Sequence, residues 1–343
     1  MSATSGVATG EFAQGQPPLN PGRGNGKNKR ASLHDGSGRR AAVLIVPTLA
    51  LLAIVIVYPI ITAVTQSFQS DAGLDPTTGL FVEGGFAGLS NYTHWLLQDC
   101  GTGAFSCPEG TLASQFWTST GVTFFFTVVA VTLETVLGLI FALVMHRSFK
   151  GRAILRASVL VPWAIPTAVT AKLWYFIFAY DGIANRLLGT EILWTGDGWA
   201  PKFAIIIADT WKTAPFMALL ILAGLQVIDG SVYEAAKMDG ATAWQRFRFI
   251  TLPLVRPALM VAVLFRTLDT LRMYDLPAIL TGGAGNTSTL SMLVVDQVRV
   301  GFNAASALST ITFLIVFGVA FIFIKFLGAN VTEQQAPKAK KAG

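Results

Sequence analysis

Six long apolar runs constrain this chain more than any other feature of its sequence. Each is comparable to the ~20 helical residues that are needed to cross the ~30 Å hydrocarbon core of a bilayer. They lie at about 41–64, 116–145, 154–178, 203–228, 257–280 and 304–327. A backbone in lipid must satisfy its hydrogen bonds within its own segment or barrel, so we expect six transmembrane helices and an all-α polytopic membrane protein.

The composition agrees with a chain that lies mainly in lipid. Of its 343 residues, 52% are hydrophobic and 13% charged, against about 25% charged in soluble domains. The first apolar run is too long for a signal-peptide core and is expected to be an uncleaved anchor. We expect a disordered basic tail at 1–40, a membrane domain at 41–328 and a second tail at 329–343.

The distribution of basic residues predicts how the chain is oriented. Residues 1–40 contain six Lys and Arg, and the segments 147–156 and 229–256 contain four each. The segment 69–115 contains none, although it has five acidic residues. Because basic segments stay on the cytoplasmic side, both termini and the 229–256 loop should be cytoplasmic and 69–115 should face outward, in a plasma or inner membrane. The net charge of +6 then reflects orientation, and no nucleic-acid partner is expected.

Both cysteines fall in the segment that is expected to face outward. Cys100 and Cys107 are separated by glycines that permit a tight bend. An oxidising compartment and this spacing favour a disulfide, and two unpaired thiols are the alternative.

The loop after the fourth run carries two helix-start patterns. Ser231 with Glu234, and Thr242 with Gln245, each pair a hydroxyl with an acid or amide three residues later, as in a capping box. Gly240 between them can adopt the left-handed conformation that ends a helix. The pattern predicts two helices that are hinged at Gly240.

The loop also has features of a docking surface. Ala235 and Ala236 give the first helix a patch of small side chains, which another protein surface could approach closely. Pro253 is expected to end the second helix, and Pro257 to begin the fifth span. A movement of the loop would then travel along one continuous helix. A loop that merely packs beneath the bundle is the alternative.

The fifth run carries four charges, Arg266, Asp269, Arg272 and Asp275, which alternate in sign at intervals of three. Ionisable groups in lipid usually face a polar pathway or one another. These four charges are therefore expected either to line a translocation path or to form a ladder in which each charge pairs with the next. The lone acid of the second run, Glu134, is expected to have a partner on a neighbouring helix. The candidate substrate-path residues are Trp174, Asp209, Trp211, Lys212, Arg266, Asp269, Arg272, Tyr274 and Asp275.

A long motif in the loop resembles that of a known family. Glu234-Ala235-Ala236, three residues, Gly240, nine residues, Ile250, one residue and Leu252-Pro253 is similar to the EAA motif of permease subunits of binding-protein-dependent ABC importers. Other patches resemble the carbohydrate branch, of the maltose and glycerol-phosphate type. They include Gly88 to Tyr92, Trp163 to Pro166, and Tyr274 to Gly283.

The resemblance implies the six-helix fold of type I ABC importer permeases, with the loop as a coupling helix seated in an ATP-binding subunit. The residues that would take this role are Glu234, Ala235, Ala236, Asp239, Gly240, Leu252 and Pro253. The implied partners are a second permease, a dimer of ATP-binding subunits and an extracytoplasmic solute-binding protein, lipid-anchored or soluble. Overall similarity to actinobacterial trehalose-recycling permeases implies trehalose as substrate, with maltose-like oligosaccharides and glycerol phosphates as alternatives.

The chain contains no Gly-x-x-x-x-Gly-Lys-Ser/Thr phosphate loop. ATP and Mg²⁺ are therefore expected on a separate ATPase, and this chain is expected to bind no cofactor or metal and to have no catalytic residue. An ion-gradient-driven secondary transporter would explain the intramembrane charges equally well, but it would have no ATPase to dock. A membrane-embedded enzyme is the third class, and no HExxH or nucleophile-elbow motif supports it.

Overall fold

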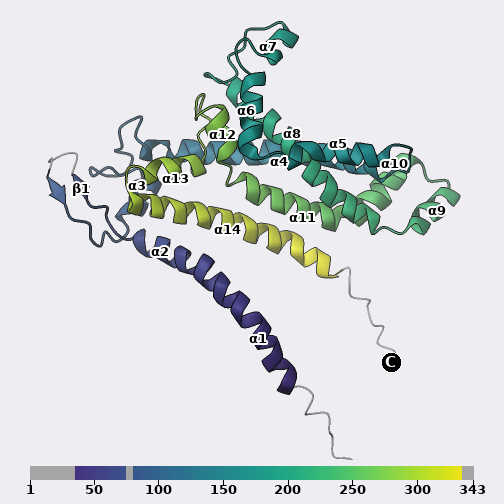
Figure 1. Ribbon diagram of the computed structural model, residues 1–343, viewed down its shortest axis with the longest axis horizontal. Coiled ribbons are helices and arrows are strands. Elements are labelled where there is room, and N and C mark those ends of the chain that lie inside the picture. Colours follow the sequence, from purple (N-terminus) through teal and green to yellow (C-terminus); the bar gives the residue numbers. More distant parts are fainter. Residues whose placement is uncertain (1–34, 75–79, 334–343) are drawn as a thin grey trace, which may run out of the picture. The chain divides into compact units, whose positions relative to one another are not determined.

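The computed structural model describes residues 35–74 and 80–333 (Figure 1). The chain divides into two compact units between Pro59 and Ile60. Along the sequence, α1 (Asp35–Leu52) passes through a π-helical turn, η1 (Ala53–Val57), into α2 (Tyr58–Gln66), within which the division falls. Helix α1 thus begins at Asp35, inside the expected tail. The remainder of both expected tails lies outside the described residues, apart from the last turn of the final helix.

By length and composition, five helices of the described residues can cross a membrane. A sixth span results if one sharply bent pair crosses as a unit. The first is Val43–Gln66, and the others are centred on α4 (Phe116–His146), α8 (Ala200–Gln226), α11 (Leu252–Thr270) and α14 (Phe302–Glu333). The structure is therefore mostly helical, as the apolar runs predict.

The third apolar run is not one straight helix. It forms α5 (Arg152–Ala164) and α6 (Thr167–Ile177), which meet at 93°. Pro166 lacks a backbone N–H and excludes the helical conformation at Ile165, so the break falls here. The Lys212 ammonium on α8 donates to the Ile165 carbonyl at 2.6 Å. This bond satisfies an acceptor that the break exposes. A short α7 (Ile183–Leu188) follows.

The fifth run differs from the prediction at both ends. Helix α10 (Ala243–Arg246) continues through a π-helical segment, η3 (Phe247–Thr251), directly into α11. The predicted stop at Leu252-Pro253 is wrong, because the π-turn shifts the hydrogen-bond pattern before Pro253. At the other end α11 stops at Thr270, where hydrogen bonds to the third residue back tighten the chain.

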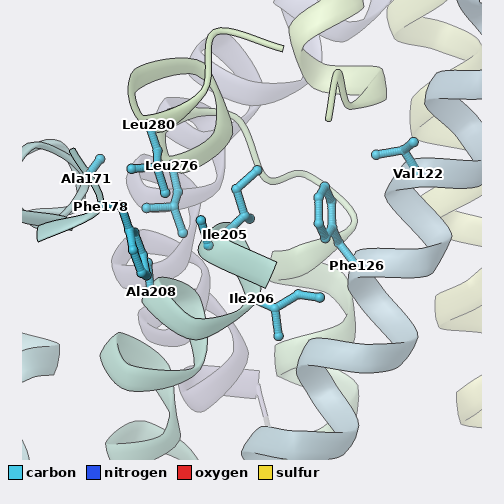
Figure 2. Close-up of a cluster of buried hydrophobic side chains, with 10 residues drawn as sticks. Val122, Phe126, Ala171, Phe178, Ile205, Ile206, Ala208, Leu276 and Leu280 are labelled. Carbon is cyan, nitrogen blue, oxygen red and sulfur yellow. The ribbon is translucent and has the colours of Figure 1, made fainter. Parts of the chain in front are cut away.

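Helix α12 (Asp275–Leu280) begins after this turn, so the expected continuous helix through Asp275 is also wrong. Helices α4, α6, α8 and α12 share one apolar core cluster. Figure 2 shows its buried side chains and labels Val122, Phe126, Ala171, Phe178, Ile205, Ile206, Ala208, Leu276 and Leu280. This packing fixes the interrupted segments against the long helices.

Helix α4 closely approaches α8 at Gly138. A Cβ atom at this residue would lie 2.7 Å from the Met217 Cβ and 3.1 Å from the Ala218 nitrogen. Backbone atoms cannot withdraw as a flexible side chain can, so Gly138→Ala is expected to separate the two helices and reduce the yield of monodisperse protein. Gly121→Ala on the same helix is the matched control, since its Cβ would meet nothing within 4 Å. Equal size-exclusion profiles for both variants would contradict this expectation.

The segment between the first two predicted spans is folded. It contains the antiparallel pair β1 (Gly73–Leu74) and β2 (Phe81–Val82), helix α3 (Ser90–Leu96) and η2 (Ala113–Gln115). Trp95 of α3 is fully buried, and its Nε1 donates to the Ala304 carbonyl at 3.0 Å. The Asp71 carboxylate accepts from the backbone of Asn303 and Ala304, at 2.7 and 3.1 Å. These contacts bind the segment to the start of α14, beside α13 (Leu290–Val298).

Candidate functional site

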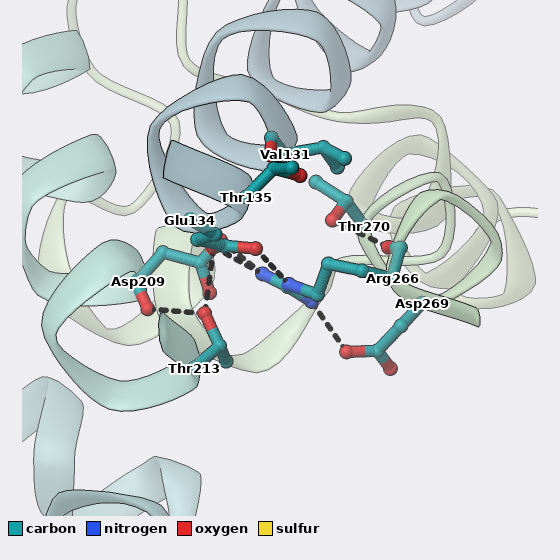
Figure 3. Close-up of polar contacts among 8 residues, drawn as sticks. All are labelled: Val131, Glu134, Thr135, Asp209, Thr213, Arg266, Asp269 and Thr270. Carbon is teal, nitrogen blue, oxygen red and sulfur yellow. Dashed lines mark hydrogen bonds and ion pairs between the residues drawn. The ribbon is translucent and has the colours of Figure 1, made fainter. Parts of the chain in front are cut away.

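Three long helices meet at a buried cluster of charges. Arg266 of α11 extends toward Glu134 of α4 and Asp209 of α8 (Figure 3). Its Nε lies 2.5 Å from Glu134 Oε2, and its Nη2 donates to Glu134 Oε1 at 3.0 Å. Nη2 also donates to Asp209 Oδ2. The side chains of Arg266, Glu134 and Asp209 are 3%, 0% and 8% exposed, so the cluster is shielded from its surroundings within this chain.

The cluster carries more acid than base. Arg266 Nη1 also contacts Asp269 Oδ2 at 2.5 Å, so one guanidinium serves three carboxylates. The planar fork of arginine suits this role because it offers several fixed donors and stays charged. The Thr213 hydroxyl adds a bond to Glu134 Oε1 at 2.6 Å. The prediction that Glu134 has a partner on a neighbouring helix is thus confirmed, and the partner is Arg266 of α11.

A cavity of about 140 Å³ adjoins the cluster, at the points where both broken segments change direction. It lies between the start of α6, the middle of α8, the end of α11 and the start of α12. Its polar lining consists of Thr167, Asp209, Lys212, Thr213, Arg266, Asp269, Arg272, Tyr274 and Asp275. Discontinuous helices around polar groups are a feature of substrate sites in transporters. The cavity can offer hydrogen-bond donors and acceptors to a polar solute.

A second candidate site is the loop that begins at α9 (Gly230–Met238). The helix starts at Gly230, where the Asp229 carboxylate accepts from the Ser231 backbone at 2.9 Å. Hydrogen bonding from Ser231, first from its backbone and then from its side chain, lowers the pKa of the exposed Asp229 carboxyl. The predicted Ser231 cap is therefore wrong, because Asp229 supplies it two residues earlier. The capping box of Thr242 with Gln245 is present.

Gly240 lies between the two helices with a φ of +77°, in the left-handed region that glycine tolerates best. Glu234, Ala235 and Asp239 are exposed, and Ala236 is half-buried. Leu252 and Pro253 are part of α11 instead of the loop. The Tyr233 hydroxyl lies 3.0 Å from the Thr251 Oγ1, which ties α9 to the base of α11. The exposed face of α9 is thus joined to the helix that carries Arg266.

Comparison with known proteins identifies the family. Residues 134–332 match the model of the binding-protein-dependent transport system inner membrane component. This chain belongs to that family. The matched region begins at Glu134 of the charge cluster and includes the α9 loop. The predicted resemblance to permeases of carbohydrate ABC importers is confirmed, and membership of this family does not fit an ion-gradient-driven secondary transporter.

Three relatives of this transport component show how far the likeness extends. It is 40% identical to the trehalose/maltose permease MalF of Thermococcus litoralis, over 82% of this chain and 92% of MalF. It is 39% identical to the trehalose permease SugA of Mycobacterium tuberculosis, over 85% and 89%. The sulfoquinovosyl glycerol permease SmoG of Agrobacterium fabrum is 36% identical, over 84% and 90%.

A solved structure supports the fold of this family member. A chain from the bacterial alginate ABC transporter, in complex with an alginate-bound periplasmic protein, matches with a TM-score of 0.66. The match covers 85% of this chain and 93% of that one, at 19% identity. The chain therefore has the fold of an ABC transporter membrane subunit.

Seven of the nine predicted path residues line the charged cavity, and Trp174 and Trp211 do not. The Trp174 ring stacks on Phe178 with centroids 5.0 Å apart and meets Trp211 edge-on at 5.8 Å. Trp211 lines a separate, mostly apolar cavity of about 410 Å³ between α4, α5 and α8. In this structure both rings are used for packing.

The predicted ladder is only partly formed. Arg266 and Asp269 pair, but among the described residues Arg272 and Asp275 form no ion pair. The Arg272 Nε instead donates to the Leu268 carbonyl at 3.3 Å. Sequence reasoning left Glu134 and Thr213 out of the site. Glu134 had a signal, as the lone acid of an apolar run, whereas a threonine in a long helix gives none.

Proposed function

We propose that this chain is the permease subunit of an ATP-driven ABC importer for a carbohydrate, and that the carbohydrate is trehalose. The observation that carries the proposal is the charged cavity where two broken segments meet, in a chain that belongs to this transport family. The names of two relatives at 39–40% identity support trehalose. The charged cavity would form half of the translocation path, and a second permease would supply the rest.

The exposure of Asp269 supports a path on this side of the chain. Its side chain is 70% exposed although it contacts the buried Arg266. A carboxylate on a spanning helix is costly against lipid, so this face is better placed toward a polar path than toward acyl chains. Lys212 and Arg272 can donate hydrogen bonds, while Asp275 can accept them. A sugar hydroxyl requires both.

The coupling role is assigned to α9 and its loop. An exposed helix tied by Tyr233 to the base of α11 suits the transfer of force from a separate ATPase, which would bind ATP and Mg²⁺. This arrangement requires the α9 end and both termini to be cytoplasmic. The folded segment 69–115, with Cys100 and Cys107 joined in a disulfide, would then face outward toward an extracytoplasmic solute-binding protein.

Uptake of labelled trehalose tests the proposal. A strain that lacks this chain is expected to lose uptake and to regain it with the wild-type gene. Asp275→Asn, which removes an acceptor charge in the cavity, is expected to lower uptake by roughly tenfold, the equivalent of ~1.4 kcal/mol. Glu191→Gln, an exposed acid outside the cavity, is the control. Unchanged trehalose uptake in the deletion strain would exclude trehalose, and parallel assays with maltose and glycerol phosphate would identify the alternative.

A further inference from the structure

A second polar cavity lies at the α9 end of the bundle. It has a volume of about 430 Å³, is open to the surroundings, and lies between the last turns of α4 and α8, α9 and the start of the next helix. Its polar lining consists of His146, Arg147, Tyr233, Lys237, Arg246 and Thr251. The charged path cavity shares none of these residues.

The cations of this pocket are not neutralised within the described part of the chain. No carboxylate lines the pocket, and Arg147, Lys237 and Arg246 form no ion pair among the described residues. The Arg246 Nη1 donates to the Ala241 carbonyl at 2.5 Å, which leaves its charge uncompensated. Arg156 brings a further cation to the same end of α4, where its Nη2 donates to the Met145 carbonyl at 2.9 Å.

The retention of basic residues on one side of a membrane explains why such loops are rich in Lys and Arg. It does not explain why residues from three separate elements converge on one cavity. Arg147 comes from the end of α4, Lys237 from α9 and Arg246 from α10. Like charges in a shared pocket repel one another unless an anion joins them. The arrangement therefore favours an anionic ligand.

We infer that this pocket binds a phosphate ester. Arginine forks and a lysine ammonium are the groups that proteins use for phosphate oxygens. The hydroxyls of Tyr233 and Thr251, which are hydrogen-bonded to each other at 3.0 Å, add polar groups to the same wall. The pocket also has an apolar part, formed by Leu143, Leu225 and others. This part suits the ester side of the ligand.

The position of the pocket, at the end of α4, makes lipid headgroups the nearest source of phosphate. Helix α4 has 31 residues, which corresponds to roughly 45 Å, longer than the ~30 Å hydrocarbon core. Its last turn can therefore reach the layer of lipid headgroups. An anionic phospholipid would place its phosphate among the cations and its glycerol ester against the apolar residues. A soluble phosphate would use the same cations.

The full-length chain, purified in a neutral detergent, can be titrated separately with phosphatidylglycerol and with inorganic phosphate. Bound lipid is measured by native mass spectrometry and phosphate by calorimetry. Arg147→Gln and Lys237→Gln are each expected to weaken binding by about fivefold, since a basic residue near a charged surface contributes ~1 kcal/mol. Lys150→Gln and Arg248→Gln are the controls, because both cations are exposed at the same end but do not line the pocket.

The inference is upheld if either ligand binds and the two pocket variants weaken it more than the controls do. Binding of phosphatidylglycerol alone would assign the lipid, and binding of both would show that free phosphate suffices. Equal losses in pocket and control variants would indicate general attraction to anions and would overturn the inference. It is also overturned if neither ligand binds. Weaker association of the Arg147→Gln chain with the ATPase would in that case indicate that a partner carboxylate fills the pocket. None of these results depends on which sugar is transported.

Discussion

Arg266→Gln is expected to destabilise the folded chain by roughly 3–5 kcal/mol, the cost of leaving buried charges without their partner. The guanidinium of Arg266 contacts Glu134, Asp209 and Asp269. The first two carboxylates are buried and come from different helices, so without Arg266 they repel each other in a medium that screens charge poorly. Thermal unfolding of the purified chain in detergent measures the effect. We expect a lower midpoint and less protein in the membrane.

Two further variants separate charge from packing at this cluster. Arg272→Gln also removes an arginine from the cavity lining, but the one hydrogen bond that its guanidinium makes to the described residues is to the Leu268 carbonyl, so this variant should unfold at nearly the parental temperature. The triple variant with Glu134→Gln, Asp209→Asn and Arg266→Gln removes all the buried charges and is expected to recover part of the loss. If Arg266→Gln unfolds no earlier than Arg272→Gln, the cluster does not hold the three helices together.

Local patterns in the sequence predicted local structure well. Hydropathy located the long apolar helices α4, α8, α11 and α14, because a bilayer requires about the same length of apolar helix wherever a chain crosses it. The Thr242 cap and the turn at Gly240 were also predicted, since each depends on residues within four positions of one another. The start of α9 was missed because Asp229, two residues before Ser231, is an equally good cap and supplies it.

Features that depend on tertiary partners were predicted only in outline: a partner for Glu134 on a neighbouring helix was expected, but which residue it is was not. The spacing of charges along the fifth run suggested either a polar path or a ladder in which each charge pairs with the next one on the same helix. Arg266 does pair with Asp269, but it also pairs with residues 57 and 132 positions away, which no local pattern contains. The break at Pro166 is likewise sustained from a distance, by the bond from Lys212 to the Ile165 carbonyl. A proline in a lipid-embedded helix can kink or break it, and the groups available to satisfy the exposed carbonyls decide which occurs.

Gly240→Trp is expected to abolish coupling between ATP hydrolysis and uptake while the chain still folds. A Cβ at Gly240 would meet nothing within 4 Å, so the indole would project away from this chain and into the cleft of the proposed ATPase. The left-handed φ of +77° adds a backbone cost of about 1–2 kcal/mol for most residues. The measurements are trehalose uptake by whole cells and ATP hydrolysis by the purified complex in the presence of its solute-binding protein.

Two variants distinguish bulk at the docking surface from backbone strain. Gly240→Asn keeps the left-handed conformation at little cost, since asparagine adopts it more readily than other residues do, and is expected to retain most of the uptake. Gly189→Trp has the same bulk, a φ of +63° and equally open surroundings, but it lies after α7, remote from α9 in the sequence and in the fold. If Gly189→Trp impairs coupling as much as Gly240→Trp does, strain alone explains the loss. If Gly240→Trp transports normally, α9 is not the surface through which ATP drives this permease.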